Sequence, residues 1–409
     1  MDIPGLPARK AALRLLDAVL RRGETLDQAG SAALSGLRSG PDKALARALA
    51  GEALRWQADL DALIDSATQQ VLPEDAKARM VLRLMLAGWL RLDTPPHAVV
   101  ATALPLLEGG PKRLAHGVFG ALVRREAKLP EVPTLPEAVQ ERWGERAEGI
   151  AKGLVLPPPL DLTLRDASAT AEWAEKLGGV SLLAGHVRLA RGDSVENITG
   201  FDAGAWWVQD LAASLPARLL GAGEGRRVLD LCAAPGGKTM QLASAGWQVS
   251  ALDASARRLE RVQANLDRTN LTAELIVGDV LEWEPAEQFD AILLDAPCTA
   301  TGTCRRHPDV LHRIGPRQIA ELADLQARML ARVAGWLKTG GTLVYAVCSL
   351  EPEEGEAQAR QVPLTPLPIG PTELSGFAPS PEGWLRTDPG MLAEHGGLDG
   401  FFIARWRKD

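Results

Sequence analysis

Residues 228–239 read Val228-Leu-Asp-Leu-Cys-Ala-Ala-Pro-Gly-Gly-Lys-Thr239, and the expected architecture of the chain follows from them. The apolar run at their start is typical of a strand that is buried on both faces. A turn with two glycines follows, and a helical pattern begins directly after it. Strand, glycine-rich turn and helix form the first unit of a nucleotide-binding α/β domain. In such a unit the glycines let the main chain approach a ligand, and the helix N-terminus offers N–H groups.

Three ligands compete for this turn. Gly237-Lys238-Thr239 resembles the end of a phosphate-binding P-loop, but that loop needs a glycine where Cys232 stands. A dinucleotide fingerprint needs the spacing Gly-x-Gly-x-x-Gly, which is absent from this turn. The third ligand is S-adenosylmethionine, whose carboxylate can use the same main-chain donors.

The twelve residues 228–239 as written resemble closely the first motif of the Sun/RsmB-type RNA cytosine-C5 methyltransferases, within the NOL/NOP/Sun family. The resemblance implies an α/β fold, in which a Rossmann-like, doubly wound methyltransferase core follows an all-α, NusB-like bundle. It also implies that S-adenosylmethionine is the cofactor. The cofactor contacts that it implies in this turn are Cys232, Ala233, Ala234, Pro235, Gly236, Gly237 and Lys238.

Length and composition limit the number of domains and the classes of protein to which the chain can belong. A chain of 409 residues is too long for one ordinary core, so we expect two or three domains. No apolar run reaches membrane-spanning length and the N-terminus lacks a signal-peptide core, so we expect a cytoplasmic protein without a membrane partner. The four cysteines include no Cys-x-x-Cys pair, so we expect no metal site. The net charge of −7 argues mildly against a nucleic-acid partner, although local basic clusters decide such binding.

Residues 1–130 are expected to be helical throughout. In the first segment Leu13, Leu16, Val19 and Leu20 make one apolar face, and Gly23 ends the helix. Later segments carry two basic groups: Lys77, Arg79, Arg83 and Arg91, then Lys112, Arg113, Arg124, Arg125 and Lys128. These residues alone fit either ordinary solvated faces or an RNA-binding bundle.

The order and spacing of residues 1–130 resemble the NusB-like RNA-binding domain that precedes the catalytic domain in RsmB-type proteins. Residues 131–203 are predicted to hold a proline-rich linker and a small α/β subdomain, which in the family faces RNA. Residues 204–409 are predicted to form the methyltransferase domain. Trp206 and Trp207 at its entrance can pack in a core or stack on a base, and packing is the favoured interpretation.

The predicted core alternates strands and helices, as a doubly wound parallel sheet requires. The second strand, residues 248–253, ends in Asp253, which is predicted to accept hydrogen bonds from a ribose. The alternative for Asp253 is a helix N-cap. The third strand, residues 275–279, ends in Asp279, which is predicted to lie beside the adenine. The alternative for Asp279 is a turn residue.

Two cysteines follow the next two strands, which are predicted at residues 289–298 and 342–348. The segment between them has helical apolar spacing, and if it is the crossover helix the two strands are neighbours. Cys298 and Cys348 then emerge at the same carboxyl edge of the sheet, where open α/β sheets bind ligands. The alternative is a pair of buried core cysteines.

A thiol suits the chemistry that the resemblance implies. Carbon 5 of cytosine is a poor nucleophile, but addition of a thiolate to carbon 6 makes carbon 5 enamine-like and able to attack a sulfonium methyl group. This is covalent catalysis, and it needs a pocket that favours the thiolate.

The resemblance assigns Cys348, in Ala346-Val-Cys-Ser349, as the nucleophile and Cys298 as the residue that assists product release. It assigns Asp295 to the base, at N3 and the exocyclic amine, and also to the cofactor site. A Pro-Cys such as Pro297-Cys298 is the nucleophile in DNA cytosine-C5 methyltransferases, which keeps that class open. The family usually has Thr before the catalytic cysteine, and Val347 stands there instead.

Three further segments complete the expectation. The loop at residues 299–315 is predicted to grip phosphates near a flipped base. Residues 305–317 carry four arginines and one acid. Residues 351–356 are predicted to be a solvated acidic turn. Residues 398–405 resemble the last motif of the family and are predicted to form the closing strand.

Taken together, the sequence predicts a monomeric, S-adenosylmethionine-dependent RNA cytosine-C5 methyltransferase. The NusB-like bundle makes 16S ribosomal RNA the expected substrate and partner. Two alternatives stay open: a non-catalytic RNA-binding or ribosome-assembly factor on the same fold, and a DNA cytosine-C5 methyltransferase.

Overall fold

The structure is a computed structural model that describes residues 3–192 and 194–409. It divides into two compact units. One runs to Leu156 and includes Cys304–Ile314, and the other takes Pro157–Thr303 with Gly315–Asp409. Within these described ranges, no helix is both long and apolar enough to cross a membrane.

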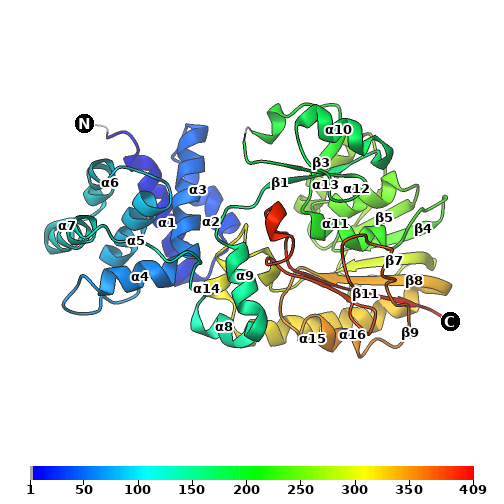
Figure 1. The fold of residues 1–409 in the computed structure, drawn as a ribbon. Coiled ribbons are helices and arrows are strands. Elements are labelled where there is room, and N and C mark those ends of the chain that lie inside the picture. The colour runs from blue at the N-terminus through cyan, green and yellow to red at the C-terminus, as the bar shows by residue number, and fades with distance from the viewer. Residues whose placement is uncertain (1–2, 193) are drawn as a thin grey trace. The chain divides into compact units, whose positions relative to one another are not determined.

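The first unit is helical, as its amphipathic segments predict (Figure 1). Two short helices, α8 and α9, follow the proline-rich segment and were not anticipated. The α-helices of this unit are α1 Leu6–Arg22, α2 Leu26–Leu34, α3 Gly40–Arg55, α4 Gln57–Asp65, α5 Lys77–Leu90, α6 Pro96–Ala103, α7 Gly109–Arg124, α8 Glu137–Trp143, α9 Ala147–Gly153 and α14 Val310–Arg313.

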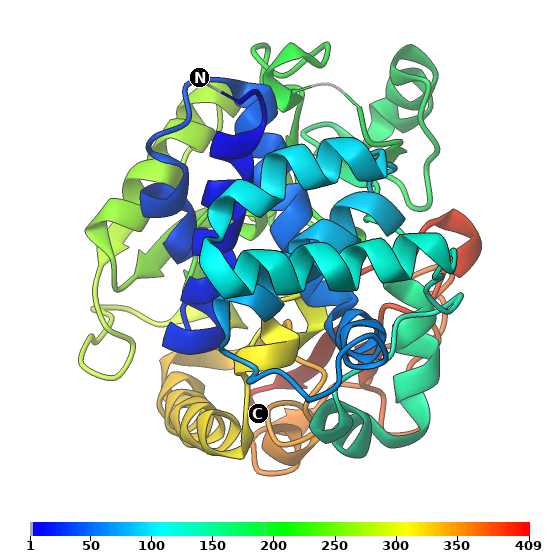
Figure 2. The ribbon, with the colours of Figure 1, turned by 90° about the vertical axis from the view of Figure 1, so that its left-hand side faces the viewer.

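The core of this unit forms around α5, whose side chains are buried almost without interruption from Ala78 to Gly88. Helices α1, α3, α4, α6 and α7 all contact α5. Figure 2 views the unit from the side on which α6 and α7, drawn in cyan, lie nearest to the viewer. Helix α1 ends at Gly23 in a left-handed conformation, as the sequence predicts.

The second unit begins with a small antiparallel sheet in the order β2-β1-β3, made of β1 Leu160–Leu164, β2 His186–Leu189 and β3 Trp206–Val208. Helix α10, Thr170–Leu177, packs against β2. Trp206 lies fully buried in the core of this subdomain, and Trp207 is buried nearby. Both tryptophans therefore pack, as the favoured interpretation predicted.

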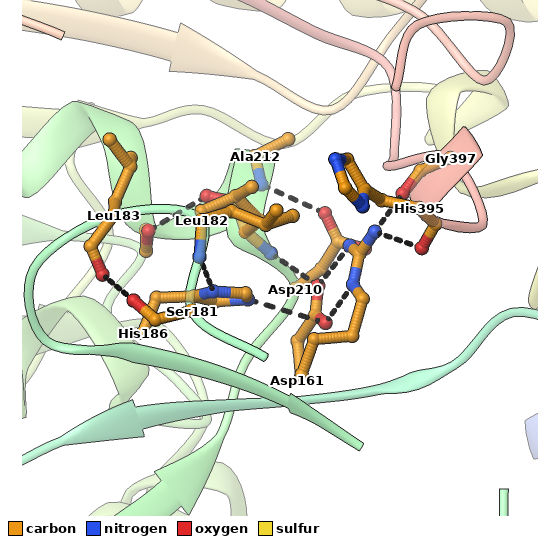
Figure 3. A network of polar contacts seen from close by, with 12 residues as sticks. Asp161, Ser181, Leu182, Leu183, His186, Asp210, Ala212, His395 and Gly397 are labelled. Atoms are coloured by element: carbon orange, nitrogen blue, oxygen red, sulfur yellow. Dashed lines mark hydrogen bonds and ion pairs between the residues drawn. The ribbon is translucent and has the colours of Figure 1, made fainter. Parts of the chain in front are cut away.

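A buried network joins the small sheet to the chain that leads into the last strand (Figure 3). Asp161 on β1 accepts two hydrogen bonds of 2.7 Å from Arg188 on β2. Arg188 also donates to the carbonyl oxygens of His395 (2.9 Å) and Gly397 (2.7 Å). Burial alone would raise the pKa of Asp161, but Arg188 and His186 outweigh burial and hold that pKa below its ordinary value. The network thus fixes, within the second unit, the segment that leads into the last strand, β11 Phe401–Arg407.

The main sheet has the order β10-β11-β8-β7-β4-β5-β6, with β9 paired to β11. Strands β6, β5, β4, β7 and β8 are parallel, and β10, β9 and β11 pair antiparallel at one end. The strands are β4 Arg227–Leu231, β5 Gln248–Asp253, β6 Glu274–Val277, β7 Phe289–Asp295, β8 Leu337–Val347, β9 Thr365–Pro366, β10 Leu385–Thr387 and β11 Phe401–Arg407. This confirms the doubly wound α/β core.

Helices lie on both sides of the main sheet (Figure 1). Alternate residues of each central strand face opposite layers. One face packs on α11 Leu211–Arg218 and α12 Gly237–Ser244, and the other packs on α15 Pro316–Val333 and α16 Glu356–Ala359. Helix α13, Ala256–Thr269, follows β5. Because both faces are covered, the strands read as continuous apolar runs, and their carboxyl ends are left to carry polar groups.

Candidate active site

The glycine turn after β4 has the geometry that its sequence predicts. Cys232 (φ 59°) and Gly236 (φ 100°) adopt left-handed conformations, and α12 begins at Gly237. A Cβ on Gly236 would lie 3.0 Å from Val262, so a side chain there would be strained as well as crowded. The turn therefore presents the main chain and the N-terminus of α12 at the carboxyl end of β4. This arrangement fits a ligand carboxylate.

Asp253 ends β5 beside this turn, and its side chain is completely buried. Its carboxylate accepts hydrogen bonds from the N–H groups of Ala234 (3.2 Å) and Ser255 (2.9 Å), and it pairs with Arg258 at 2.8 Å. The N-cap of α13 is Ser255, so Asp253 does not cap that helix itself. Its carboxylate fixes the turn against α13, and its role toward a ribose stays a prediction.

Asp279 lies in the loop after β6 and is exposed. Its carboxylate accepts a hydrogen bond of 2.8 Å from Leu281 N–H, which is the geometry of a turn residue. The carboxyl ends of β4, β5 and β6 are adjacent in the sheet, so a ligand that starts at the glycine turn can extend along them. The contact between Asp279 and an adenine stays a prediction.

The two cysteines meet at the carboxyl edge of neighbouring strands. Cys298 follows β7 and Cys348 follows β8, and β7 pairs with β8 in parallel. Their Sγ atoms lie 3.4 Å apart, and both side chains are partly exposed. Convergence at one edge is what the sequence predicts, and partial exposure argues against two inert core thiols.

A lysine and a carboxylate complete the site. Lys238, on the first turn of α12, is buried and donates a hydrogen bond of 2.7 Å from Nζ to Asp295 at the end of β7. Its ammonium group also lies 5.3 Å from the ring centre of Phe401. Burial alone would lower the pKa of Lys238, but Asp295 and the nearby Cys348 raise it, so the side chain stays charged. A fixed cation therefore lies at the carboxyl ends of β4 and β7.

The sequence predicted contacts of Lys238 and of Asp295 with the cofactor, but it did not predict that they form a pair. The order of the strands could have indicated this pair. Lys238 lies on the first turn of the helix after β4, and Asp295 ends β7. These two strands are neighbours in any sheet in which β4 is the first strand of a doubly wound core.

The thiol of Cys298 is a weak acid. Its pKa lies well above the ordinary value because the thiol is hydrogen-bonded with Cys348, because the surrounding protein leaves little solvent to stabilise a charged sulfur, and because the carboxylate of Glu354 is nearby. Cys298 therefore keeps its proton at neutral pH and can donate it toward the sulfur of Cys348. A thiol that keeps its proton suits proton handling in the site.

Three arginines that were expected to bind RNA are buried. Arg305, in the loop predicted to grip phosphates, is only 1% exposed. In the first unit, Arg79 and Arg83 are buried and ion-paired with Asp61 on α4. Arginine is amphipathic and pairs readily with carboxylates, so a basic run in sequence need not form a basic surface. These three arginines support the fold and cannot reach a phosphate.

The prediction of a solvated acidic turn is wrong for two of its acids. Glu351 and Glu354 are completely buried, whereas Glu353 is exposed. Glu354 is held there by donors on the segments that carry the two cysteines, including Thr299 N–H at 2.9 Å. Sequence patterning missed the burial of Glu354 because its donors on Thr299 and Gln326 lie far from it in the chain.

A buried carboxyl group lies beneath the glycine turn. Asp230 on β4 is completely buried, and its Oδ2 accepts a hydrogen bond of 2.6 Å from Thr239. In the described part of the chain its Oδ1 has no hydrogen-bond partner. Burial raises the pKa of Asp230 to about 7, and the neighbouring Lys238 offsets only part of this effect.

Asp230 should therefore make stability fall as pH rises. Its folded-state pKa lies above its unfolded value, so between about pH 4 and pH 7 the folded chain holds a proton that the unfolded chain has lost. Asp230→Asn keeps an acceptor for Thr239 and removes the charge. As the pH rises from 4 to 8, we expect the free energy of unfolding of this variant to increase relative to that of the native protein, by up to about 4 kcal/mol at pH 8. Urea unfolding of both proteins from pH 4 to 8 checks this, and parallel profiles would contradict it.

Comparison with known proteins adds independent findings. The family model described as "16S rRNA methyltransferase RsmB/F" matches residues 217–407, and the model described as "NusB family" matches residues 6–109. The chain is 36% identical to the ribosomal RNA small subunit methyltransferase B of Klebsiella pneumoniae, with 97% of each chain covered. It is 34% identical to the protein of the same name from Pseudomonas syringae pv. tomato, with 97% of this chain and 96% of that protein covered.

A solved structure has a similar fold. The crystal structure of a methyltransferase homologue from Pyrococcus horikoshii matches with a TM-score of 0.57 and 28% identity, over 67% of this chain and 94% of that chain.

Proposed function

The chain belongs to the RsmB/F family of 16S rRNA methyltransferases, and on that premise we propose a specific reaction for it. The chain transfers a methyl group from S-adenosylmethionine to carbon 5 of a cytosine in 16S ribosomal RNA, through a covalent bond between Cys348 and carbon 6. The observation that carries this proposal is the pair of sulfur atoms 3.4 Å apart beside the buried ion pair of Lys238 and Asp295.

The cofactor site is proposed along the carboxyl ends of β4, β5 and β6. The turn from Cys232 to Gly237 and the N-terminus of α12 fit a carboxylate. Asp253 is proposed to hold the ribose, because each carboxylate oxygen can accept more than one hydrogen bond. Asp279 is proposed to lie beside the adenine. S-adenosylmethionine, when bound, supplies an electrophilic methyl group.

Cys348 acts first in the proposed mechanism. Its thiolate adds to carbon 6 of the cytosine and leaves carbon 5 nucleophilic. Negative charge moves into the ring, Asp295 accepts a hydrogen bond from the exocyclic amine, and the ammonium group of Lys238 that pairs with Asp295 offsets the developing charge. Lys238 keeps Asp295 in place by direct contact.

Cys298 acts in release. After methylation, carbon 5 carries a proton that must leave before the bond between sulfur and carbon 6 can break. Cys298 is proposed to give its own proton to the departing sulfur of Cys348 and to take up the carbon 5 proton in its place, directly or through water, which restores the ring and frees Cys348 as a thiol.

The first unit is proposed to hold the RNA, and α7 is the helix best suited to this role. Helix α7 contains no acidic residue, and Lys112, Arg113 and Arg124 on it are exposed. Lys112→Gln with Arg113→Gln should weaken RNA binding and reduce its salt dependence by about one slope unit per charge, because each charge displaces a counterion. Binding titrations across salt concentrations measure both effects.

The matched control removes one lysine and one arginine that already pair with acids. Lys152→Gln with Arg328→Gln changes the net charge equally, but these residues pair with Glu148 and Asp324. An equal loss of affinity in both double variants would contradict a specific role for α7.

Mapping of 5-methylcytosine tests the function itself. Ribosomal RNA from cells with and without the gene should differ at a cytosine of 16S ribosomal RNA, and the purified protein with S-adenosylmethionine should restore that mark. If neither changes a cytosine, the chain is a binding factor on the same fold. Methylation of DNA in preference to RNA would move it to the other alternative class.

A further inference from the structure

A buried carboxylate lies behind the two cysteines, and neither composition nor the motifs point to it. The side chain of Glu354 is completely inaccessible to solvent. Its Oε1 accepts hydrogen bonds of 2.9 Å from Thr299 N–H and from Gln326 Nε2 on α15. Its Oε2 accepts hydrogen bonds from the hydroxyl groups of Thr299 and Ser349. Four donors therefore converge on one carboxylate.

The donors follow the cysteines directly in the chain. Thr299 comes immediately after Cys298, and Ser349 comes immediately after Cys348. The two hydroxyl groups also contact each other at 3.1 Å. If Glu354 moved, Thr299 and Ser349 would move with it, and each of them is joined by one peptide bond to a cysteine of the pair.

Two neighbours strengthen this arrangement. Gln326 also donates to the carbonyl oxygen of Pro297, the residue before Cys298, so it grips the same loop on the other side. The hydroxyl group of Tyr345 on β8 donates to the main-chain oxygen of Glu354 at 2.6 Å. The carboxylate is therefore anchored to the sheet and to α15, and its position does not depend on solvent.

We propose that Glu354 is a positioning residue that holds the loops after β7 and β8 at the spacing that places the Cys298 and Cys348 sulfur atoms together. The inference deepens the proposed function and rests on it. Glu354 acts on the two sulfur atoms through Thr299 and Ser349, which donate hydrogen bonds to its carboxylate. It would matter for both attack and release, because both steps need the two thiols at one base.

The charge of Glu354 gives a second, measurable effect. The pKa of Cys298 is raised first by its hydrogen bond with Cys348, then by burial and by the charges of Cys348 and Glu354. Removal of the carboxylate charge should lower the pH at which Cys298 becomes reactive toward an alkylating reagent. A residue that only filled space would not have this effect.

The loops should stay folded when the carboxylate is removed. Gly302 N–H donates to the carbonyl oxygen of Cys348 at 3.0 Å, and Gly302 packs so closely that an added Cβ would lie 1.9 Å from Gly400 O. This main-chain contact keeps the loops paired, so the expected change is in the spacing of the sulfur atoms and not in the fold.

The test compares Glu354→Gln and Glu354→Ala with the native protein. The first readout needs neither RNA nor cofactor: the full chain is equilibrated with reduced and oxidised glutathione, and the disulfide between Cys298 and Cys348 is quantified by peptide mass spectrometry. The ratio gives the effective concentration of one thiol at the other. We expect it to fall by at least about tenfold in Glu354→Ala, and less in Glu354→Gln, since the amide keeps volume and one acceptor.

The second readout is kinetic. A small misplacement of reacting groups costs about 100-fold in rate, so we expect kcat to fall by that order in Glu354→Ala, with the KM for S-adenosylmethionine changed by less than about twofold. The alkylation midpoint of Cys298 should move to lower pH in both variants.

Asp59→Ala is the matched control. Asp59 accepts hydrogen bonds from Thr134 N–H (2.9 Å) and the Thr134 hydroxyl (2.7 Å), the same pair of donors that Thr299 offers to Glu354, but it lies in the first unit. It should lower the unfolding temperature without changing the disulfide equilibrium or the alkylation midpoint of Cys298.

The outcomes separate the two claims. If the Glu354 variants change only the unfolding temperature, as Asp59→Ala does, the positioning role is wrong and the methyltransferase proposal is untouched. If the thiol readouts respond to Glu354 but the native protein methylates no cytosine, the positioning role holds and the proposed function fails. If Glu354→Ala does not fold, the two thiol readouts on Glu354→Gln decide, and native values there overturn the inference.

Discussion

Cys348→Ala is expected to abolish methyl transfer while the protein still binds its cofactor. The substitution removes the proposed nucleophile, and without addition to carbon 6 the cytosine carbon 5 cannot attack a methyl group. We expect the rate to fall by more than about 1,000-fold, as for other enzymes that lose their nucleophile. Transfer of a radiolabelled methyl group to RNA measures it.

Cofactor binding is the internal control for this variant. Cys348 follows β8, whereas the proposed cofactor site begins at the turn after β4, so the Kd for S-adenosylhomocysteine measured by calorimetry should change by less than about twofold. If Cys348→Ala still turns over, the nucleophile is not Cys348, and Cys298 in its Pro-Cys setting becomes the candidate, as in the DNA enzymes.

Cys298→Ala should have the opposite character, because it leaves the attack intact and removes the group proposed for release. The Cys298 sulfur lies 3.4 Å from that of Cys348 and keeps its proton at neutral pH, so its loss removes the nearest proton-handling group. We expect the protein to stay covalently attached to RNA after methylation. A protein–RNA band should persist on a denaturing gel and should require S-adenosylmethionine.

Cys304→Ala is the control for this experiment. Cys304 is also a free cysteine, but it is completely buried and belongs to the first unit. It should turn over like the native protein and form no lasting band. If Cys298→Ala forms no adduct while Cys348 is present, the release role is wrong.

Much of the second unit could be predicted from local sequence. Strand ends are marked by polar residues after apolar runs, so Asp253 and Cys298 were placed correctly at carboxyl edges. The expected crossover helix made β7 and β8 neighbours, and this brought Cys298 and Cys348 together. The extent of β8 was less predictable: the strand was expected to begin at residue 342, but it begins at Leu337 and runs through Gly340 and Gly341.

What sequence could not give was the fate of charged side chains. Glu354 and Arg305 look like surface residues by type, and each is buried because distant donors or packing partners are available only in the folded chain. The pairing of Lys238 with Asp295 was also missed, because the order of the strands, and not the local pattern, brings these two residues together. Local patterns predict which residues face the core. They do not predict which charged residues pair when the two lie as far apart in sequence as Lys238 and Asp295, which are 57 positions apart.

The residue before the proposed nucleophile shows a further difference from the family pattern. Val347, where the family usually has Thr, is completely buried and packs in the layer between the sheet and α15. Cys348 points out of the strand end and is partly exposed. A hydroxyl group at position 347 would thus lie in an apolar layer, which Val fills without an unsatisfied polar atom.

The measurement that tests the central claim most directly is the site of the RNA adduct in Cys298→Ala. The trapped complex is digested with nuclease and protease, and the peptide that carries a nucleotide mass is sequenced by mass spectrometry. The proposed mechanism predicts a methylated cytidine nucleotide on Cys348, formed only when S-adenosylmethionine is present. A nucleotide on another residue, or an adduct without the methyl group in the presence of the cofactor, would contradict it.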